Sequence, residues 1–232
     1  MRIKGVSLYP LRFCDEAVYP HLLLGNRFHI TIRAISHTSS TTEQRVERVR
    51  SELSNLGGFP NFFGHQRFGT IRPITHLVGS FLVRSDPQKA ALTFLAQPSP
   101  HEHPELREAR QQLLDTQDFQ EAARSFPKHL RYERWMLSHL AKRPRDFVGA
   151  FRRLPRKLRK LFIQAYQSFL FNKFLSQRIQ RGIPLNEAQI GDYALSLNGY
   201  GLPITQFTQV TVQSIQSFNR WKDAYCSSAY RV

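Results

Sequence analysis

Apolar and polar residues alternate strictly over residues 27–33, which read Arg-Phe-His-Ile-Thr-Ile-Arg. A period of two residues puts one row of side chains on each face of a strand. One face of this segment is apolar and the other is mostly basic. The pattern therefore predicts a strand over 27–35, paired in an antiparallel sheet with its apolar face buried. The short mixed segment from Ile3 to Leu11 also has strand character.

The pattern changes to a helical period after residue 40. Four apolar residues recur at intervals of three and four, as on one face of a helix: Val46, Val49, Leu53 and Leu56. Ser40 and Glu43 have the spacing of a capping box, and the pair Gly57-Gly58 is typical of a helix end. We therefore expect a helix over 42–56. A strand followed by a helix and a loop favours an α/β or α+β domain.

The composition shifts after residue 85. Residues 96–104 form a polar loop with three prolines, which predicts a subdomain boundary between about 83 and 105. Five helical segments follow, separated by prolines: 105–115, 118–125, 129–141, 145–153 and 156–181. Residues 1–85 thus form one predicted part of the chain and residues 86–232 a second, mainly helical to residue 181. Residues 203–218 return to a strand-like mixture.

The chain has 232 residues, with 33 Lys and Arg against 17 Asp and Glu, a formal net charge of +16. Such an excess predicts a polyanionic partner, with nucleic acid the leading candidate; a merely soluble basic surface is the alternative. Two cysteines are too few for a disulfide scaffold or a structural zinc site. No apolar run reaches the length of a transmembrane helix, and the first residues have no signal-peptide pattern. These features predict a cytoplasmic protein without a membrane partner.

The densest group of basic residues straddles Pro155, at the predicted start of the last helix. We call it the basic cluster; its members are Arg152, Arg153, Arg156, Lys157, Arg159 and Lys160. Each phosphate that such side chains neutralise releases counterions, so an RNA contact here would make the affinity depend on salt. The alternative is a solvated helix face. The density of positive charge, with almost no acid nearby, favours RNA.

Residues 58–69, which we call the aromatic loop, combine glycine with phenylalanine. The phenylalanine rings offer faces on which a base can stack, at roughly 1–3 kcal/mol per base. An arginine in the loop can hold a phosphate or lie over a ring, and its asparagine and glutamine can bond a base edge. A packed surface loop with aromatic anchors is the alternative, and the residues alone leave both open.

The aromatic loop resembles a motif of the TruD family of tRNA pseudouridine synthases, in its archaeal and eukaryotic form, Asn-x-Phe-Gly-x-Gln-Arg-Phe-Gly. Seven fixed positions match: Asn61, Phe63, Gly64, Gln66, Arg67, Phe68 and Gly69. In that family the Asn and the first Phe of the motif line a pocket for the target uridine. The resemblance therefore implies a uridine pocket at Asn61 and Phe63, with further residues of the motif around them: Gln66, Arg67, Phe68 and Gly69.

Other segments resemble the same family, in the family's order, from residue 1 to about 200. They are Gly25-Asn26-Arg27-Phe28, Tyr132-Glu133-Arg134, Leu154-Pro155-Arg156-Lys157-Leu158, Gln167-Ser168-Phe169-Leu170-Phe171-Asn172 and Gly191-Asp192-Tyr193. The resemblance implies an α+β fold, with part of the mixed or antiparallel pseudouridine-synthase sheet in 1–85. It also implies a mainly helical TruD-type insertion domain in 86–232. The family pattern fades from about residue 201, so a divergent tail is expected there.

The last predicted helix has an interpretation from its residues alone. Four apolar residues share one stripe that is expected to lie in the core: Leu158, Phe162, Ala165 and Phe169. Gln167, Ser168 and Asn172 are polar residues among Phe and Leu. We expect them to satisfy buried backbone groups or one another, with contact to a pocket as the alternative.

By resemblance, the family isomerises uridine to pseudouridine in tRNA, at position 13 of the D-arm, without a metal or an organic cofactor. One aspartate attacks the substrate covalently, after the uridine has left its stack to reach the pocket. The family carries this aspartate in a Gly-x-Lys-Asp motif ahead of the first strand, and this sequence contains no such motif. The context of Asp15, Phe-Cys-Asp-Glu, does not match. We therefore expect a partial chain, without the catalytic aspartate and inactive alone.

Two alternatives to an enzyme stay open on the sequence. One is a non-catalytic RNA-binding remnant that keeps the uridine surface, and the other is a basic RNA- or ribosome-associated protein with no pocket. A metal site at His101-Glu102-His103 is not expected, because the loop offers no matched third ligand. The expected partner is tRNA, and no cofactor or metal is expected.

Overall fold

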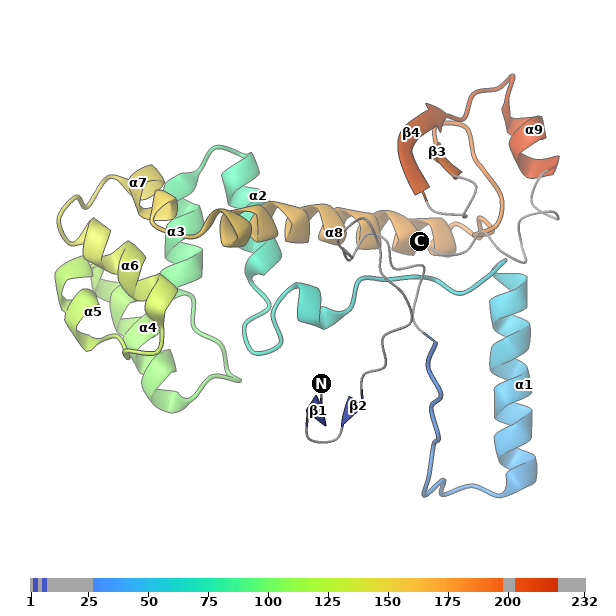
Figure 1. Ribbon diagram of the computed structural model, residues 1–232, viewed down its shortest axis with the longest axis horizontal. Coiled ribbons are helices and arrows are strands. Elements are labelled where there is room, and N and C mark those ends of the chain that lie inside the picture. Colours follow the sequence, from blue (N-terminus) through green and yellow to red (C-terminus); the bar gives the residue numbers. More distant parts are fainter. Residues whose placement is uncertain (1, 4–5, 8–26, 198–202, 221–232) are drawn as a thin grey trace. The chain divides into compact units, whose positions relative to one another are not determined.

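The computed structural model of the protein describes four segments: residues 2–3, 6–7, 27–197 and 203–220 (Figure 1). Contacts divide the chain into two compact units. Residues 59–185 form one, which we call the helical unit, and residues 1–58 with 186–232 form the other. Asp15, the Gly25-Asn26 part of the first family segment and the end of the tail lie outside the described residues.

The helical unit is a series of helices separated by short loops. Its elements are the 3-10 turn η2 His65–Arg67 and the α-helices α2 Thr75–Val83, α3 Pro87–Ala96, α4 Pro104–Thr116, α5 Phe119–Ser125, α6 Arg131–Leu140, α7 Phe147–Arg152 and α8 Arg156–Gln180. The five helices predicted between residues 105 and 181 are confirmed, each end within two residues. Helices α2 and α3 are additional, because α2 is almost uniformly apolar and α3 lies inside the segment that composition marks as a boundary.

Aspartates set the points at which three of these helices begin. The side chains of Asp86, Asp118 and Asp146 accept hydrogen bonds from backbone N–H groups in the first turns of α3, α5 and α7. Such N-caps satisfy donors that a helix leaves unpaired. The pKa of the Asp146 carboxyl is lowered, mainly by the hydrogen bond from the Gly149 N–H and next by the hydrogen bond from His139.

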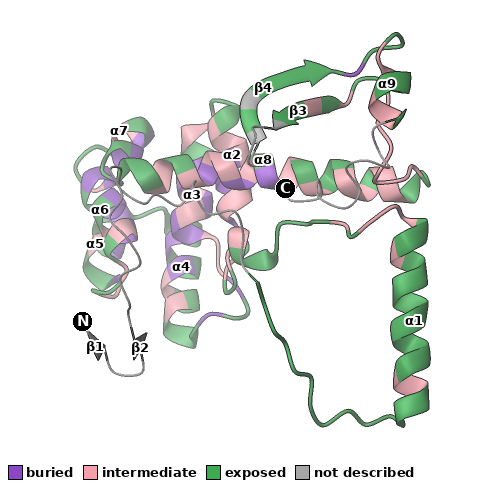
Figure 2. Ribbon diagram, turned by 45° about the vertical axis from the view of Figure 1, so that its right-hand side comes forward, coloured by how far each residue is buried: buried purple, intermediate pink, exposed green. Residues whose placement is uncertain are grey.

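Helix α8 packs closely along α2 (Figure 1). A Cβ on Gly79 of α2 would lie 2.0 Å from the carbonyl oxygen of Phe162 in α8, so only glycine fits there. The predicted apolar stripe of α8 meets the core at this point, where Phe162 and Ala165 are buried. Figure 2 shows that the buried residues gather in the helical unit. Its largest fully buried apolar side chains come from α2, α3, α4, α6 and the residue after α5: Val78, Leu95, Leu113, Phe126, Met136, Leu137 and Leu140.

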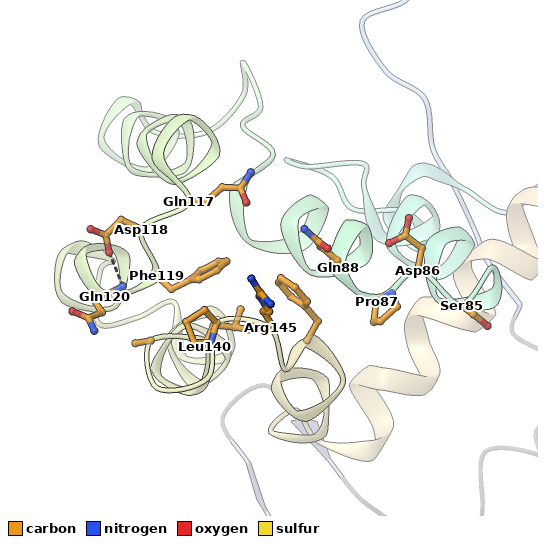
Figure 3. A pocket seen from close by; sticks show the side chains of 13 residues that line it. Ser85, Asp86, Pro87, Gln88, Gln117, Asp118, Phe119, Gln120, Leu140 and Arg145 are labelled. Carbon is orange, nitrogen blue, oxygen red and sulfur yellow. Dashed lines mark hydrogen bonds between the residues drawn. The ribbon is translucent and has the colours of Figure 1, made fainter.

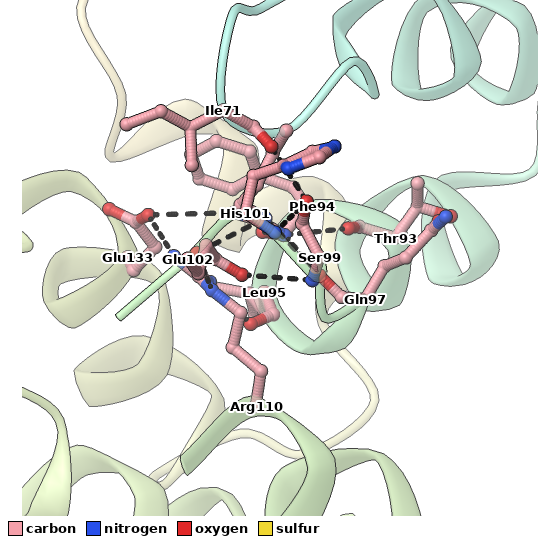
Figure 4. Close-up of polar contacts among 11 residues, drawn as sticks. Ile71, Thr93, Phe94, Leu95, Gln97, Ser99, His101, Glu102, Arg110 and Glu133 are labelled. Carbon is pink, nitrogen blue, oxygen red and sulfur yellow. Dashed lines mark hydrogen bonds and ion pairs between the residues drawn. The ribbon is translucent and has the colours of Figure 1, made fainter. Parts of the chain in front are cut away.

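Two arginines and two glutamates form a buried network that links the loop after α3 with α4 and α6 (Figure 4). We call it the arginine–glutamate network. Arg110 donates to Glu102 at 2.9 Å and to Glu133 at 3.0 Å, and a third donor bonds the Leu95 carbonyl. Only 2% of the Arg110 side chain is exposed. Arg72 lies 3.6 Å from Glu102, and burial, aided by nearby Arg110, lowers the pKa of Arg72 to about 10.

The arginine–glutamate network also explains the His101-Glu102-His103 segment. Glu102 is buried and accepts from the N–H of Ser99 as well as from Arg110. The hydroxyl of Ser99 in turn donates to the carbonyl of Ile71 at 2.7 Å. Glu102 thus anchors this proline-rich loop to its neighbours.

The other unit combines helices with short antiparallel hairpins. Its described elements are β1 Arg2–Ile3, β2 Val6–Ser7, α1 Ser39–Asn55, β3 Tyr193–Leu197, β4 Pro203–Gln209 and α9 Ile215–Arg220. Strand β1 pairs with β2, and β3 pairs with β4, with Tyr193 opposite Gln209. The strand-like mixture expected over 203–218 gives β4 but ends in the helix α9. Helices and antiparallel strands together confirm the α+β class.

The prediction of a paired strand over 27–35 is wrong for the described residues, where this segment has no strand partner. Phe28, Ile30 and Ile32 are 75–80% exposed rather than buried. A ladder needs a second strand alongside, and none of the described strands lies there. Ala34 also has a left-handed φ of 55°, which breaks the extended geometry.

The helix predicted over 42–56 is confirmed as α1, but its N-cap differs from the prediction. Thr38, and not Ser40, accepts a hydrogen bond from the N–H of Thr41. Thr38 has the extended backbone that an N-cap requires, and by Ser40 the chain is already helical. No residue of α1 is buried, and Figure 2 shows the helix mostly exposed.

Contacts divide the chain after Gly58 and before Asn186, whereas composition places a boundary within 83–105. Helix α2 packs against α3 and α8, so both sides of the compositional shift belong to one body. The composition changes there because the prolines and polar residues of 96–104 form a loop inside the unit. The assignment of 1–85 to a catalytic core and 86–232 to an insertion domain stays a prediction.

Candidate functional site

The aromatic loop leads into α2 through the turn η2. Gly69 has a φ of +108°, and a Cβ there would lie 2.1 Å from the carbonyl oxygen of Arg72. Only glycine fits, which explains the last position of the motif. The N–H of Thr75 bonds the carbonyl of Phe68 at 3.1 Å and ties the end of the loop to α2.

The side-chain amide of Asn172 in α8 holds the backbone of Phe63 through two hydrogen bonds. Asn172 Oδ1 accepts from the Phe63 N–H at 2.9 Å, and Asn172 Nδ2 donates to the Phe63 carbonyl at 2.9 Å. The two residues are 109 positions apart in the sequence. An amide that satisfies both polar groups of one residue fixes its position and its orientation. We call this pair of bonds the Asn172 clamp.

Arg67 is held one turn earlier on α8. Its Nε donates to Ser168 Oγ at 3.1 Å, while the Ser168 hydroxyl donates to the carbonyl of Gln164 at 2.9 Å. The Arg67 guanidinium lies over the ring of Phe63, 5.7 Å from the centroid. The ring of Phe171 meets that of Phe63 edge to face at 5.5 Å. These two contacts fix the orientation of the Phe63 ring.

A second aromatic cluster anchors the loop to α2 and α8. His76 stacks on Phe169 with centroids 4.5 Å apart, and Phe68 meets His76 edge to face at 5.2 Å. Burial lowers the pKa of His76, so the neutral imidazole is favoured between the rings. Lys173 Nζ lies 5.3 Å from the Phe169 centroid. His76 could not be singled out from the sequence, because this histidine belongs to none of the family segments.

The outer side of the aromatic loop is open. Phe62 and Phe63 are 41% and 43% exposed, and the side chains of Asn61 and Gln66 are exposed beside them. A Cβ on Gly64 would meet no described atom within 4 Å, so a ligand can approach the backbone closely there. A fixed aromatic ring beside two amides suits a flat heteroaromatic ligand, which can stack on the ring and bond the amides at its edge.

Several predicted pocket residues thus lie against one side of α8. Asn61 and Gln66 instead lie on the open face of the aromatic loop, and Gly69 allows the tight turn that leads into α2. Two of the three polar residues of α8 satisfy backbone groups as expected: Asn172 bonds Phe63, and Ser168 bonds its own helix. Both also contact the aromatic loop, at Phe63 and Arg67; the alternative of contact with a pocket stays a prediction. Gln167 is exposed.

The basic cluster lies at the junction of α7 and α8. Its exposed members are Arg152, Arg153, Arg156, Lys157 and Lys160. Arg153 has a structural contact, since its Nε donates to His139 Nδ1 at 3.3 Å. His139 therefore carries its proton on Nε2, which donates to Asp146 at 2.8 Å. Arg159 is half-buried, and its Nε has no hydrogen-bond partner in the described part of the chain.

A hollow of about 760 Å³ lies elsewhere in the helical unit, between the starts of α3 and α5 and the loop before α7 (Figure 3). No residue of the aromatic loop lines it. Its two carboxylates, Asp86 and Asp118, cap α3 and α5, and their negative charge disfavours a phosphate ligand. Among the residues that the structure describes, Arg145 is the one cation that lines it. We therefore place the candidate site at the aromatic loop.

Metal ligation and membrane insertion can be checked only over the described segments. Within them, no three His, Cys, Asp or Glu side chains lie where they could share a metal ion. No helix among these same residues is both long and apolar enough to cross a membrane.

Relatives of the chain share the name tRNA pseudouridine synthase D. Residues 1–228 match the family described as tRNA pseudouridine synthase D (TruD). A "Probable tRNA pseudouridine synthase D" of Methanosarcina barkeri is 42% identical over 221 residues, 95% of this chain and 50% of the relative. A protein of the same name from Methanopyrus kandleri is 44% identical over 193 residues, 83% of this chain and 47% of the relative.

The fold has a close counterpart among solved structures. The crystal structure of a Methanosarcina mazei protein classed as TruD matches with a TM-score of 0.78 and 41% identity. The match covers 83% of this chain and 44% of that one. The chain therefore belongs to the TruD family. It spans about half the length of the curated relatives that it matches.

Proposed function

We propose that the chain carries the uridine-binding surface of a tRNA pseudouridine synthase, which isomerises uridine to pseudouridine at position 13 of tRNA. The observation that carries this proposal is the Asn172 clamp, because it joins two separate family segments, the aromatic loop and residues 167–172, into one surface. The relatives are named as probable tRNA pseudouridine synthases, which supports the proposed isomerisation of uridine.

A uracil that has left its stack can lie on the open face of Phe63, where stacking contributes roughly 1–3 kcal/mol. Asn61 and Gln66 offer donors and acceptors to the edge of the base. Arg67 packs on the Phe63 ring and holds it in place. These contacts bind and orient the base, but breaking the glycosidic bond also requires a nucleophile.

The aspartates of the helical unit already have structural partners. Asp86, Asp118 and Asp146 cap helices, and Asp115 accepts from the Gln111 side chain at 2.8 Å. A carboxylate held in this way is poorly placed to attack a sugar or a base. In line with the family, we propose that the nucleophile belongs to a Gly-x-Lys-Asp segment, which these 232 residues do not contain.

Replacing the stacking ring should remove the preference for uridine. We expect the chain to bind a single-stranded RNA with one central uridine roughly 5- to 100-fold more tightly than the same RNA with an abasic site there. Phe63→Ala should bring this ratio close to one. Asn172→Ala should lower it as well, because the ring loses its fixed position. Fluorescence anisotropy of labelled RNA measures both affinities.

Phe174→Ala is the matched control for this experiment. Phe174 lies on α8, the helix that carries Asn172, and it is 66% exposed. The control should keep the ratio of the unaltered chain. An unaltered chain that binds both RNAs equally would contradict the uridine-binding proposal. A Phe63→Ala chain that keeps the full ratio would show that another residue holds the base.

We further propose that the basic cluster binds the tRNA backbone. The first turn of α8 contains no acidic residue and has no side-chain cap. Cations at the positive end of a helix dipole destabilise the helix. Arg156 and Lys157 thus stand where folding disfavours them, and together with Lys160 and the helix end they concentrate positive potential. An anionic ligand accounts for this arrangement better than a solvated face does.

The triple variant Arg156→Ala, Lys157→Ala and Lys160→Ala should weaken tRNA binding and reduce its salt dependence. We expect the slope of log affinity against log salt to fall in magnitude by about 2 to 3, since each phosphate contact contributes about 0.9 or less. The variant should be at least as stable as the unaltered chain, because repulsion at the helix start is removed. Arg153 is left in place because it bonds His139.

A variant of three other exposed arginines of the helical unit, Arg84→Ala, Arg107→Ala and Arg124→Ala, controls for the loss of net charge. It should change the slope much less than the cluster variant. Equal slopes for the two variants would mean that the basic cluster is only a solvated face.

A further inference from the structure

Helix α6 carries a surface group of aromatic and basic side chains that belongs neither to the aromatic loop nor to the basic cluster. The Arg131 guanidinium lies over the rings of both Tyr132 and Trp135, at 5.5 and 5.3 Å from their centroids. The two rings meet edge to face at 5.5 Å. Trp135 is 41% exposed, which is unusual for the largest apolar side chain.

The core of the helical unit takes only Tyr132 from this group, which is half-buried and packs against it. The buried face of α6 is formed by Glu133, Met136 and Leu137. Glu133 bonds Arg110, and the neighbouring Arg134 donates to the carbonyl of Phe126. Core packing and the arginine–glutamate network thus hold the helix in place without Arg131 or Trp135.

The exposed face of α6 carries positive charge. Arg131, Trp135 and Ser138 are exposed and follow one another at intervals of four and three residues, which puts them on one stripe of the helix, on the order of 10 Å long. Lys142 is also exposed and lies two residues after the end of α6, in the turn that follows. Arg131 forms no ion pair among the described residues, so its charge is available to a ligand.

We propose that this stripe is a second RNA contact, in which an unpaired base stacks on Trp135 while Arg131 and Lys142 meet the adjoining phosphates. A ring with an arginine on it beside further cations is the combination that sequence-tolerant single-strand binding uses. A protein partner fits less well, because the other members of the stripe, Arg131 and Ser138, are charged or polar. The proposal rests on tRNA being the ligand, but not on the isomerisation of uridine.

The fluorescence of Trp135 can report directly on RNA binding at this stripe. The chain has two tryptophans, Trp135 and Trp221, so Trp221→Phe leaves Trp135 as the only source of indole fluorescence. Titration of this variant with unmodified tRNA, and with a single-stranded RNA decamer, should quench the emission of Trp135 as binding saturates. Binding that saturates without any change in this emission would overturn the proposal, while the uridine-binding proposal would stand.

Substitutions separate stacking from charge. Trp135→Ala should weaken decamer binding roughly 5- to 100-fold with an unchanged salt slope, because no phosphate contact is lost. Trp135→Phe should retain most of the affinity, since any aromatic ring can stack, and it also shows that the fold survives a change at this position. Arg131→Ala should reduce the salt slope by less than about one. Equal affinities of the Trp135→Ala and unaltered chains for both RNAs would overturn the proposal.

Discussion

A polypeptide of these 232 residues, incubated with unmodified tRNA, is expected to form pseudouridine slowly. The rate should be at least about ten-thousand-fold lower than that of a protein that also carries the family's Gly-x-Lys-Asp motif. The physical reason is that loss of a covalent nucleophile costs several orders of magnitude in rate, while binding and stacking contacts leave only a small residual acceleration. In the proposed function the aromatic loop only positions a base, and the aspartates of the helical unit are engaged as helix caps or in hydrogen bonds. Chemical labelling of pseudouridine in the recovered tRNA measures the outcome.

Supplying a Gly-x-Lys-Asp segment from a relative, fused or as a separate chain, should restore the activity. The same segment with its aspartate changed to asparagine is the control and should restore nothing. Turnover by the 232 residues alone that survives Asp15→Asn would contradict the proposal of a missing nucleophile. A fused protein that binds uridine-containing RNA but stays inactive would favour the alternative of a non-catalytic RNA-binding protein.

Removal of Arg110 is expected to give the largest loss of stability of any single substitution in the helical unit. Arg110→Ala leaves Glu102 and Glu133 buried with only Arg72 nearby, and breaking a buried ion pair in this way typically costs about 3–5 kcal/mol. It also leaves the carbonyl of Leu95 without its donor. Urea unfolding followed by circular dichroism measures the change in the free energy of unfolding.

Arg107→Ala is the matched control, because Arg107 is exposed on the same helix three residues earlier. It should change the free energy of unfolding by less than about 0.5 kcal/mol. Replacing Arg110 together with Glu102 and Glu133 by apolar residues should cost less than Arg110→Ala alone, since no charge is then left unpaired. A triple variant that is less stable than Arg110→Ala would show that the network contributes net stability of its own.

The helices of residues 105–181 could be predicted from the sequence because prolines separate them and each has a regular apolar stripe. Local signals of this kind decide where a helix begins and ends. The segment 27–35 shows the limit of the approach. Its alternation predicts which face of a strand would be buried, but not whether a second strand lies beside it, since that depends on residues far away in the chain. Helix α3 was missed for another reason, because a loop rich in proline obscured its end.

The aromatic loop could be identified from its motif, whereas the contacts that shape it could not. Gly69 is explained by its positive φ and the position of the Arg72 carbonyl, and the position of Arg67 by Ser168, 101 residues away. The sequence marked Asn172 as a polar residue in need of a partner without indicating that the partner is Phe63. His76 carried no signal at all. Tertiary contacts of this kind depend on the packing of α2 on α8, which no local pattern encodes.

The Asn172 clamp also orders events during synthesis of the protein. The ribosome adds roughly 5–20 residues per second, so Phe63 is made on the order of 5–20 s before Asn172, which lies 109 residues later. During that interval the loop has neither the amide that holds its backbone nor the helix on which Arg67 and Phe68 rest. A nascent chain that ends between Gly69 and Asn172 thus has the whole motif but cannot have the surface. The capacity to bind a base should appear late and abruptly as translation proceeds, when the second half of α8 has left the exit tunnel.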